Sequence, residues 1–546
     1  MTVLDRLLPQ SARRLLIATW LALVVVTIIV PVVSWLRRPP GSVFTGYSYE
    51  SVGDIFVYLN FIEQAKNGAV LFTDMFTPEP HEPVLLHPLF LILGRVAAAV
   101  HASPLVVWHA ARALLLFPLV VVVWHLVAQF VRGRSLRIFG FAAILLTGGI
   151  AMESPITSVF LGGLYSPKSL LSFLDTLVFV LLLLRLLQWQ RVRSTGALLT
   201  GLALWQALLE PYPLFLWGCL AVTAVFVSFL FERNARRTLL SFVAIGVSLG
   251  VAIVVLAVMV LGSPILRAWS LNAEGQSSSV LFVVLFALPL GLLASLGIVA
   301  RRRSLLTPPT RFLLVWLCVG LAVLWSPYPY AYRLIGYVQP VLALFAVFGA
   351  VALWQRHSRT LLWKALVLLF LGLALSDTVR HVGFNLTGDY NGTEDRYLTA
   401  DEVRLFRWVR DATPADSLFL TSPSWDTLFA QQAYRRVYAT LGWQTIRLMD
   451  RLREAIDVYS GRLAGADLQQ FVETNGIAYI VVGRRERVSG TFRGFGRDGE
   501  PIGIEASFDF LSGEAPFLQR VYHSETIDVY QVKPQQHEVS PQPLES

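Results

Sequence analysis

Residues 15–36 of the 546-residue sequence are LLIATWLALVVVTIIVPVVSWL, an apolar run with Arg13 and Arg14 before it and Arg37 after it. A helix of about 20 apolar residues matches the hydrocarbon thickness of a bilayer. A secretory signal has a shorter apolar region of about 7–15 residues, followed by a small-residue cleavage site. This run is longer and lacks such a site, so we expect a retained first transmembrane helix.

The composition extends this reading to most of the chain. The mean hydropathy is +0.59 and only 15% of the residues are charged, against about 25% in a typical soluble domain. A net charge of +9 would suggest a nucleic-acid partner in a soluble protein. Here the arginines fall in short loops between apolar runs, as membrane topology requires, so we expect no nucleic-acid partner. Cys219 and Cys318 both lie in apolar runs, which argues against a disulfide framework or a zinc motif.

The pattern predicts a polytopic α-helical membrane protein with about eleven spans. We expect residues 1–377 to form the membrane domain, residues 378–533 a soluble α/β domain, and residues 534–546, rich in Pro, Gln and Ser, a disordered tail. The predicted spans are residues 15–36, 104–131, 138–152, 169–188, 196–210, 213–231, 239–261, 280–300, 312–326, 334–354 and 361–377.

Alternate loops differ in their content of Lys and Arg. One set is strongly basic, from the loop end at Arg13 and Arg14 to the last such loop with Arg356, Arg359 and Lys364. Basic loops stay in the cytoplasm, so we expect a cytoplasmic N-terminus in a multi-pass plasma (inner) membrane protein, with residues 37–103 and everything after Asp377 outside. Residues 84–100 are apolar over almost the length of a span; we expect them to lie on the outer face, with crossing as the alternative.

The first outer loop contains GYSYESVGDIFVYLNFIEQAKNGAVLFTDMFTPEPHEPVLLHPLF, residues 46–90, and most of the acidic residues on the outer side of the membrane domain. Ile55, Leu59 and Ile62 share one face by helical spacing, which predicts an amphipathic helix over residues 52–67. Gly68 follows and is a typical helix end. The predicted membrane domain therefore includes a juxtamembrane helix on its outer side.

Asp54 stands at the start of this predicted helix. Ser51 and Asp54 resemble a capping box, a role that needs no chemistry, although Glu or Gln is usual at the second position. A carboxylate at an outer helix start, beside a membrane cleft, is also what a general base or a metal ligand requires. Both interpretations of Asp54 stay open at the level of the sequence.

Glu79, His81 and Glu82 form a second cluster in the same loop. Carboxylate and imidazole groups are ligands for divalent cations, and they could also contact an acceptor. The spacing E-P-H-E is not a known metal motif, and a solvated turn stiffened by prolines explains it as well. We favour the interpretation as a solvated turn and keep these three residues as possible metal or acceptor contacts.

Several predicted spans end on the outer side in polar turns that carry Glu153, Lys168, Glu210 and Arg333. Ionisable groups at membrane depth are costly and usually face a cavity or a partner. Arg333 opposes the dipole of the span that it begins, which favours an anionic partner, with snorkelling to headgroups as the alternative. Lys168 follows Ser-Pro, an N-cap signature, so the helix N-terminus beside it could also bind an anion. The neighbouring tyrosines are typical interface anchors.

The soluble domain alternates predicted helices and strands, which is typical of an α/β fold. Predicted helices are residues 401–411, 443–460 and 466–474, and predicted strands are residues 417–421, 436–441, 477–482, 517–521 and 526–532.

Together these features resemble the GT-C superfamily of integral membrane glycosyltransferases, in an uncharacterised prokaryotic branch. Four features carry the resemblance: the first span with its long outer loop, an early Asp in GDIFVYLNFIEQAKNG, a late span that opens YRLIGYVQP, and an outer C-terminal domain. The YRLIGYVQP stretch looks like the R-x-x-x-x-x-x-P segment of those enzymes, and RRVYATLGW and IAYIVVGRRER look like segments of large membrane proteins of this type.

The resemblance implies a glycosyltransferase that moves a hexosyl or pentosyl group from a polyprenyl-phosphate donor to a glycan, lipid or protein acceptor of the cell envelope, outside the membrane. It assigns Asp54 as general base or metal contact and Arg333 as a ligand of the donor phosphate, with Lys168 as a second candidate for that role. Glu79, His81, Glu82, Glu153 and Glu210 are candidate metal or acceptor contacts. Several GT-C families have a D-x-D or D-E pair in this loop, and this sequence lacks it. The resemblance therefore does not establish a cofactor; the candidate cofactor is a divalent cation, Mg²⁺ or Mn²⁺.

Two other classes of protein fit parts of the pattern. A transporter or flippase of lipid-linked substrates would use charges near mid-span, and Asp175 lies six residues inside a predicted span. A non-catalytic membrane assembly protein would keep the fold without its chemistry. A transfer assay with labelled polyprenyl-phosphate sugars separates these alternatives.

Overall fold

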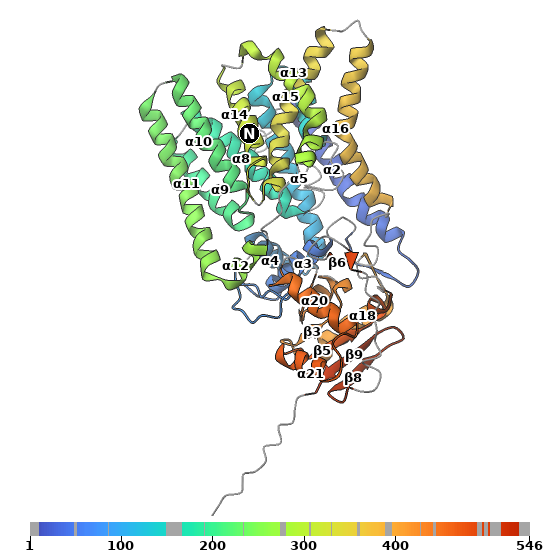
Figure 1. Cartoon of the computed structure of the whole chain (residues 1–546). Helices are drawn as coiled ribbons and strands as arrows, with labels where there is room; N and C mark the ends of the chain where they lie inside the picture. The colour runs from blue at the N-terminus through green and yellow to red at the C-terminus, as the bar shows by residue number, and fades with distance from the viewer. Residues whose placement is uncertain are drawn as a thin grey trace, which may run out of the picture.

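In the computed structural model, a bundle of long helices forms one part of the molecule and a β-sheet with its own helices forms the other (Figure 1). We call the end of the bundle that faces the sheet region the sheet end, and the opposite end the far end. The structure describes residues 10–47, 52–85, 87–148, 166–189, 192–232, 234–272, 280–304, 307–328, 330–356, 361–387, 396–425, 427–440, 444–488, 494–495, 501–502 and 515–533.

Each span predicted from the sequence falls on a helix of the bundle. These helices are α2 (Gln10–Leu36), α5 (Pro104–Phe130), α6 (Arg134–Leu146), α8 (Pro167–Leu187), α9 (Val192–Leu209), α10 (Pro213–Glu232), α11 (Ala235–Gly262), α13 (Val280–Ala300), α14 (Pro308–Leu324), α15 (Ile335–Arg356) and α16 (Leu361–Thr387).

The chain is an integral membrane protein, because several of these helices have the length and composition of membrane spans. Within the described residues, six qualify on both criteria: α2, α5, α8, α10, α11 and α15. Others are shorter; α6 has 13 residues, which at about 1.5 Å per residue reaches only about 20 Å. The count of eleven spans therefore stays a prediction.

Two helices cover the sheet end of the bundle. α3 (Val52–Lys66) matches the helix predicted in the first loop, and Ile55, Leu59 and Ile62 are all buried. α4 (Pro88–Ala99) has 12 residues, so at about 1.5 Å per residue it is about 18 Å long, too short for a hydrocarbon core of about 30 Å. It lies against α3, because a Cβ on Gly94 would come within 2.5 Å of the carbonyl oxygen of Ile62.

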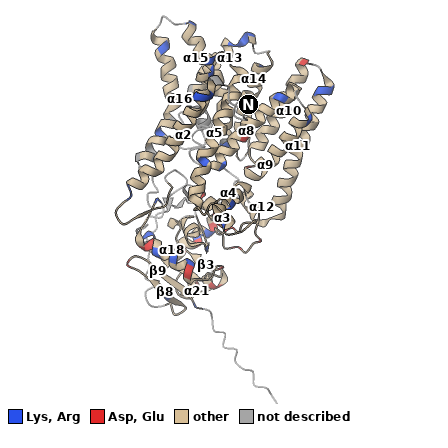
Figure 2. Ribbon diagram, turned by 180° about the vertical axis from the view of Figure 1, so that it is seen from behind, with Lys and Arg blue, Asp and Glu red and all other residues tan. Residues whose placement is uncertain are grey.

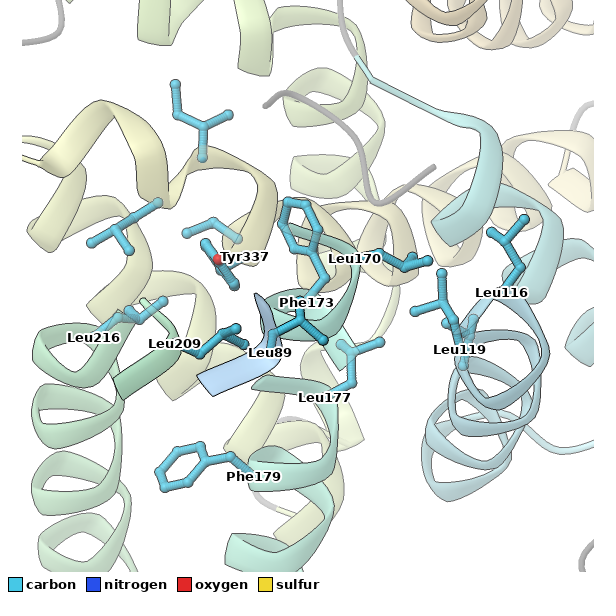
Figure 3. Packing of buried hydrophobic residues seen from close by; sticks show 14 of the residues in the cluster. Leu89, Leu116, Leu119, Leu170, Phe173, Leu177, Phe179, Leu209, Leu216 and Tyr337 are labelled. Atoms are coloured by element: carbon cyan, nitrogen blue, oxygen red, sulfur yellow. The ribbon is translucent and has the colours of Figure 1, made fainter. Parts of the chain in front are cut away.

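The bundle core is closely packed around α15, which is buried from Ile335 to Ala350. Figure 3 shows Tyr337 of α15 beside Phe173 of α8, with their ring centroids 4.6 Å apart. α15 also crosses α13 at a pair of glycines. A Cβ on Gly349 would lie 1.9 Å from the carbonyl oxygen of Leu293, and a Cβ on Gly297 equally close to that of Phe345. Small residues at such a crossing let two membrane helices approach closely.

Among the described residues of the C-terminal region, five strands form one sheet in the order β4-β3-β5-β9-β8. β3 pairs in parallel with β4 and β5, and β9 pairs antiparallel with β5 and β8. β5 reads YIVV and is buried throughout, as expected for a strand covered on both faces. The strands are β3 (Leu418–Leu420), β4 (Arg436–Val437), β5 (Tyr479–Val482), β8 (Leu518–His523) and β9 (Asp528–Val532).

Helices flank this sheet, and two small strand pairs lie outside it. The helices are α18 (Ala400–Ala412), α19 (Leu428–Ala433), α20 (Leu448–Tyr459), α21 (Gly465–Thr474) and α22 (Arg484–Val488), and the small pairs are β1 (Val43–Phe44) with β2 (Tyr397–Leu398) and β6 (Gly494–Phe495) with β7 (Pro501–Ile502). α12 (Pro264–Asn272) follows α11 at the sheet end.

The first loop is joined to the sheet region by pairing and by hydrogen bonds. β1 pairs with β2, the amide of Val437 donates to the carbonyl oxygen of Met75 at 3.0 Å, and the side chain of Asn60 donates to the carbonyl oxygen of Ala430 at 3.3 Å. Segments more than 350 residues apart in the sequence are therefore packed together at the sheet end.

Two of the differences from the predicted boundaries have a clear physical cause. α16 continues past Asp377 to Thr387, because Thr378, Val382 and Leu386 keep a helical stripe against the bundle. The helix predicted from residue 443 begins at Leu448, because the residues before it are bound to the first loop instead. The Thr445 hydroxyl donates to the carbonyl oxygen of Phe76 at 2.6 Å. The predicted tail, residues 534–546, lies outside the described residues.

Charge is distributed unevenly along the bundle. Figure 2 shows blue Lys and Arg segments at the far end, where the α10–α11, α13–α14 and α15–α16 connections lie. Arg237 lies in the first turn of α11, Arg301 directly follows α13, and Arg356 is the last residue of α15. The sheet end instead holds the candidate acidic residues of the first loop.

Candidate functional site

A group of largely buried polar side chains lies at the sheet end of the bundle, where α3 and α4 cover it. We call it the Lys168 cluster and define it as Tyr58, Lys168, Glu210, Tyr212 and Tyr337. Its members come from α3, the start of α8, the α9–α10 connection and α15. Segments that are distant in the sequence therefore converge on one charged centre.

Lys168 and Glu210 form an ion pair at its middle. The Lys168 Nζ lies 3.1 Å from Glu210 Oε1, and the two side chains are only 9% and 5% exposed. Nζ also donates to the hydroxyl oxygen of Tyr58 at 3.0 Å, and it lies 4.8 Å from the centre of that ring. A buried ion pair of this kind is stable only if further hydrogen bonds complete it, and Tyr58 supplies one.

The predicted N-cap of α8 is present and places Lys168. Ser166 Oγ accepts from the Lys168 amide at 3.1 Å, and Pro167 is the first residue of the helix. A cation in the first helical turn opposes the helix dipole. Its position is therefore unfavourable for α8 alone, and the carboxylate of Glu210 compensates for it.

Glu210 is held by hydrogen bonds on its other side. The Tyr212 hydroxyl donates to Glu210 Oε2 at 2.6 Å, and the Tyr337 hydroxyl reaches the same oxygen at 3.5 Å. The Tyr337 hydroxyl also shares a hydrogen bond of 2.7 Å with Ser172, and the Gln206 amide donates to Ser172 Oγ at 2.8 Å. The network fixes both oxygens of the carboxylate.

Asp54 lies at the edge of this cluster, in the first turn of α3, and is partly exposed. It is close enough to Lys168 and Tyr58 to interact with both electrostatically. Asp54 and Tyr58 are four residues apart, so they share one face of α3. Ser51, the other member of the predicted capping box, lies outside the described residues.

Arg333 approaches the cluster beside Tyr212. It belongs to the short 3-10 helix η2 (Ala331–Leu334) that precedes α15. Its guanidinium carbon lies 5.8 Å from the ring centre of Tyr212 and 5.9 Å from that of Tyr330. Its charge also acts on the carboxylate of Glu210. The structure thus brings Asp54, Lys168, Glu210 and Arg333 together.

The Glu79 group lies apart from this cluster, against the sheet region. Glu79 Oε1 forms an ion pair with Arg451 Nη2 at 2.9 Å, and Glu82 is exposed. His81 Nε2 accepts from the Asp74 amide at 2.9 Å, so Nδ1 carries the proton and faces the carbonyl oxygen of Glu79. Burial lowers the pKa of His81 below its ordinary value, and the nearby Arg436 lowers it further.

Among the described residues of this loop, the contacts of Glu79 and His81 do not form a metal site. The ligand atoms of Glu79 and His81 are engaged in structural bonds, and they do not converge with Glu82. No group of three His, Cys, Asp or Glu side chains in the described part of the chain could hold a metal ion. Glu153 lies outside the described residues.

The sequence patterns did not indicate several residues of the cluster and of the hydrogen-bond network around it. Tyr58 had a usable signal, because it lies one helical turn after Asp54. Tyr212 was interpreted as an interface anchor, yet its hydroxyl binds Glu210. Ser172 and Gln206 lie in apolar runs and are fully buried; only the polarity of their side chains at that depth could have indicated them.

Apolar side chains close the cluster off from the centre of the bundle. Figure 3 shows Leu209 and Leu89 near Tyr337, with Phe173 and Leu177 of α8 beside them. All of these are buried. The polar groups therefore form a layer at the sheet end of a tightly packed apolar core.

In comparisons with known proteins, no family model and no curated sequence matched the chain. Solved structures do match. An oligosaccharyltransferase from Archaeoglobus fulgidus, in the apo form, is similar at a TM-score of 0.52 and 12% identity, over 89% of this chain and 74% of that one. The same enzyme, AglB, in complex with an inhibitory peptide and a dolichol-phosphate, gives a TM-score of 0.51 at 12% identity, over the same shares of 89% and 74%.

The arabinofuranosyltransferase AftD from Mycobacteria is similar at a TM-score of 0.53 and 15% identity, over 94% of this chain. The chain spans 40% of the length of that protein. At these identities the likeness concerns the fold. It confirms the resemblance found in the sequence: the chain has the GT-C fold of integral membrane glycosyltransferases.

Proposed function

We propose that this protein is a membrane glycosyltransferase that takes a sugar from a polyprenyl-phosphate donor and transfers it to an envelope acceptor outside the membrane. The observation that supports this most is the convergence of Asp54, Lys168, Glu210 and Arg333 at the sheet end. A carboxylate at the edge of a site with two cations is the set of groups that the reaction needs.

The compared enzymes support the class of donor and leave the acceptor open. AglB is an oligosaccharyltransferase whose structure contains a dolichol-phosphate and a peptide, and AftD is an arabinofuranosyltransferase. For this chain the proposal is a polyprenyl-phosphate carrier of a hexosyl or pentosyl group. The acceptor class remains glycan, lipid or protein.

The distribution of charge supports the proposed sidedness. Basic connections gather at the far end of the bundle (Figure 2), and basic loops remain in the cytoplasm. On this argument the N-terminus is cytoplasmic in the plasma membrane. The Lys168 cluster and the sheet region then face the outside, where a lipid-linked sugar and an envelope acceptor can meet.

The proposed step uses the residues as follows. The acceptor hydroxyl gives its proton to the carboxylate of Asp54, and its oxygen forms a bond to the anomeric carbon of the donor sugar. The bond between that carbon and the phosphate oxygen breaks, and its electron pair leaves with the polyprenyl phosphate. Arg333 and Lys168 stabilise the charge that develops on the departing phosphate.

Glu210 has a positioning role in this scheme. It keeps Lys168 charged and oriented in the absence of donor, through the 3.1 Å ion pair. When a phosphate enters, Lys168 can turn part of its hydrogen bonding toward it, while Tyr212 and Tyr337 continue to satisfy Glu210. A carboxylate left without these donors would be costly to bury.

The experiment is a transfer assay with purified full-length protein and labelled polyprenyl-phosphate sugars. Asp54→Asn should lower the rate of transfer about 100-fold or more, the usual contribution of a general base. Arg333→Ala should weaken donor use by a similar factor. Glu63→Gln is the matched control, since Glu63 is a partly exposed carboxylate of the same helix, α3, that pairs with Lys66 and belongs to neither candidate group.

The outcomes separate the candidate functions. Transfer that fails only in the Asp54 and Arg333 variants supports the proposal, and full activity of Asp54→Asn refutes the assignment of the base. Movement of intact labelled lipid between leaflets without cleavage would identify a flippase. Neither cleavage nor movement with any donor would favour an assembly protein.

A further inference from the structure

A pocket of about 520 Å³ lies where the end of α2 meets the sheet region. Its lining consists of residues 39–42, Tyr397, Thr399, Glu402, Arg484 and Arg485. None of these residues belongs to the Lys168 cluster or to the reaction proposed for it. The volume is in the range of about 300–1,000 Å³ that small ligands occupy.

The pocket lies at the carboxyl end of a parallel strand. β5 ends at Val482, and Arg484 and Arg485 follow after one glycine. β5 and β3 are parallel neighbours in the sheet. In open α/β sheets, ligands bind beyond the carboxyl ends of parallel strands, where loops diverge and helix N-termini point. The place in the fold is therefore one that suits a ligand.

A buried ion pair shapes the wall of the pocket. Arg485 Nε lies 2.7 Å from Glu402 Oε1, and the two side chains are 4% and 6% exposed. The guanidinium of Arg485 also lies 4.7 Å from the ring centre of Trp425. Glu402 Oε2 accepts from the Thr399 amide at 2.7 Å, so both oxygens of this carboxylate are engaged. Glu402 compensates for the charge of Arg485.

The remaining charge of the lining is positive. Arg484 is exposed at the pocket, beyond the neutral pair of Arg485 and Glu402. The N-terminus of α18 is already satisfied by the capping box of Thr399 and Glu402, so the cation available at this wall is Arg484. A planar guanidinium matches the geometry of a phosphate and binds it through two hydrogen bonds.

The pocket lies at the level where the chain leaves the membrane. Residues 39–42 follow α2 almost directly, and the Tyr397 hydroxyl donates to the carbonyl oxygen of Ser34 at 2.9 Å. Trp35 and Leu36, at the end of α2, are 51% and 67% exposed, and Arg38 lies 4.9 Å above the Trp35 ring. Exposed Trp and Arg at a helix end are typical of the headgroup region.

We propose that this pocket binds the phosphate headgroup of an anionic membrane lipid, with Arg484 as its main ligand. The acyl chains would lie along α2, whose residues Val25, Ile28, Ile29 and Val32 are exposed. Such a lipid would link the sheet region to the bilayer beside α2. The inference goes beyond the glycosyltransferase proposal and does not depend on it, because it concerns other residues and another ligand.

The test uses full-length protein in detergent with phosphatidylglycerol, phosphatidylcholine or glycerol 1-phosphate as probes. Native mass spectrometry measures retained lipid by its mass, and thermal unfolding measures the shift in Tm with each probe. Arg484→Gln removes the cation, and Ser42→Trp fills the pocket from the α2 side. Arg447→Gln is the matched control, because Arg447 is an exposed arginine of the same region that pairs with Asp450.

Loss of one charge-assisted phosphate contact should weaken binding by about tenfold or more. The proposal predicts that phosphatidylglycerol is retained and raises Tm in the wild type and in Arg447→Gln, and that both effects fall in Arg484→Gln and Ser42→Trp. Binding of glycerol 1-phosphate without retention of the lipid would contradict the membrane source. Equal retention of phosphatidylglycerol in all four proteins would overturn the site.

Discussion

The ion pair between Lys168 and Glu210 can be removed one charge at a time or as a unit. At 3.1 Å, two unit charges attract each other by about 5 kcal/mol for an effective dielectric constant of about 20. Desolvation offsets much of this attraction, so the pair adds little net stability. A single charge left in the same place retains the desolvation cost without the partner.

Lys168→Met should therefore lower the free energy of unfolding by about 3–5 kcal/mol, because it leaves the buried Glu210 unpaired. Glu210→Gln leaves Lys168 buried, although Tyr58 still accepts a hydrogen bond from it. The double variant carries no buried charge, and Gln at position 210 still accepts from Tyr212. We expect the double variant to lose about 3 kcal/mol less than the sum of the single variants.

The assay is thermal or denaturant-induced unfolding of the purified variants in one detergent. The expected order of stability is wild type, double variant, then either single variant. Donor use should not recover in the double variant, because the cation that contacts the phosphate is still missing. Strictly additive losses of stability would refute the reasoning, since they would mean that the two side chains do not interact.

Two further predictions concern the core and the first loop. Gly349→Leu should prevent the close crossing of α13 and α15, because even a Cβ at this position would lie 1.9 Å from the carbonyl oxygen of Leu293. The yield of folded protein on gel filtration checks this. Gly372→Leu is the control, because a Cβ at Gly372 meets open space. Burial raises the pKa of Asp74 from 3.8 to about 7, so the folded protein favours the protonated carboxyl more than the unfolded chain does. The stability that this preference contributes is fully present below pH 4 and falls by about 4 kcal/mol as the pH rises to 7. The Tm of Asp74→Asn minus that of the wild type should therefore increase between pH 5 and pH 8; a difference that stays constant over this range would contradict it.

The helices and much of the candidate site could be predicted because their signals are local or repeat along the chain. Apolar runs marked the bundle helices, and the alternation of basic loops predicted that Asp54, Lys168, Glu210 and Arg333 lie at one end of the bundle. The Ser-Pro pair before Lys168 indicated an N-cap, which is present. In each of these cases, a short stretch of sequence contains the physical cause of the structure that it forms.

The partners of these residues could not be predicted in the same way. Glu79 looked like a metal ligand or part of a solvated turn, and its actual partner, Arg451, lies 372 residues later in the chain. A similarly long separation along the chain explains why the helix predicted from residue 443 starts late, since Thr445 binds the first loop. Such contacts depend on how the loop and the sheet region pack together, which no local pattern describes.

The claim that the Lys168 cluster binds a lipid-linked phosphate is tested most directly by native mass spectrometry of the purified full-length protein. The proposal predicts an adduct with the mass of a polyprenyl phosphate, or of its sugar derivative, on the wild type. That adduct should be strongly reduced in Arg333→Ala and retained in Glu63→Gln. A wild type that binds no polyprenyl phosphate when it is supplied, or an adduct that Arg333→Ala retains in full, would contradict the claim.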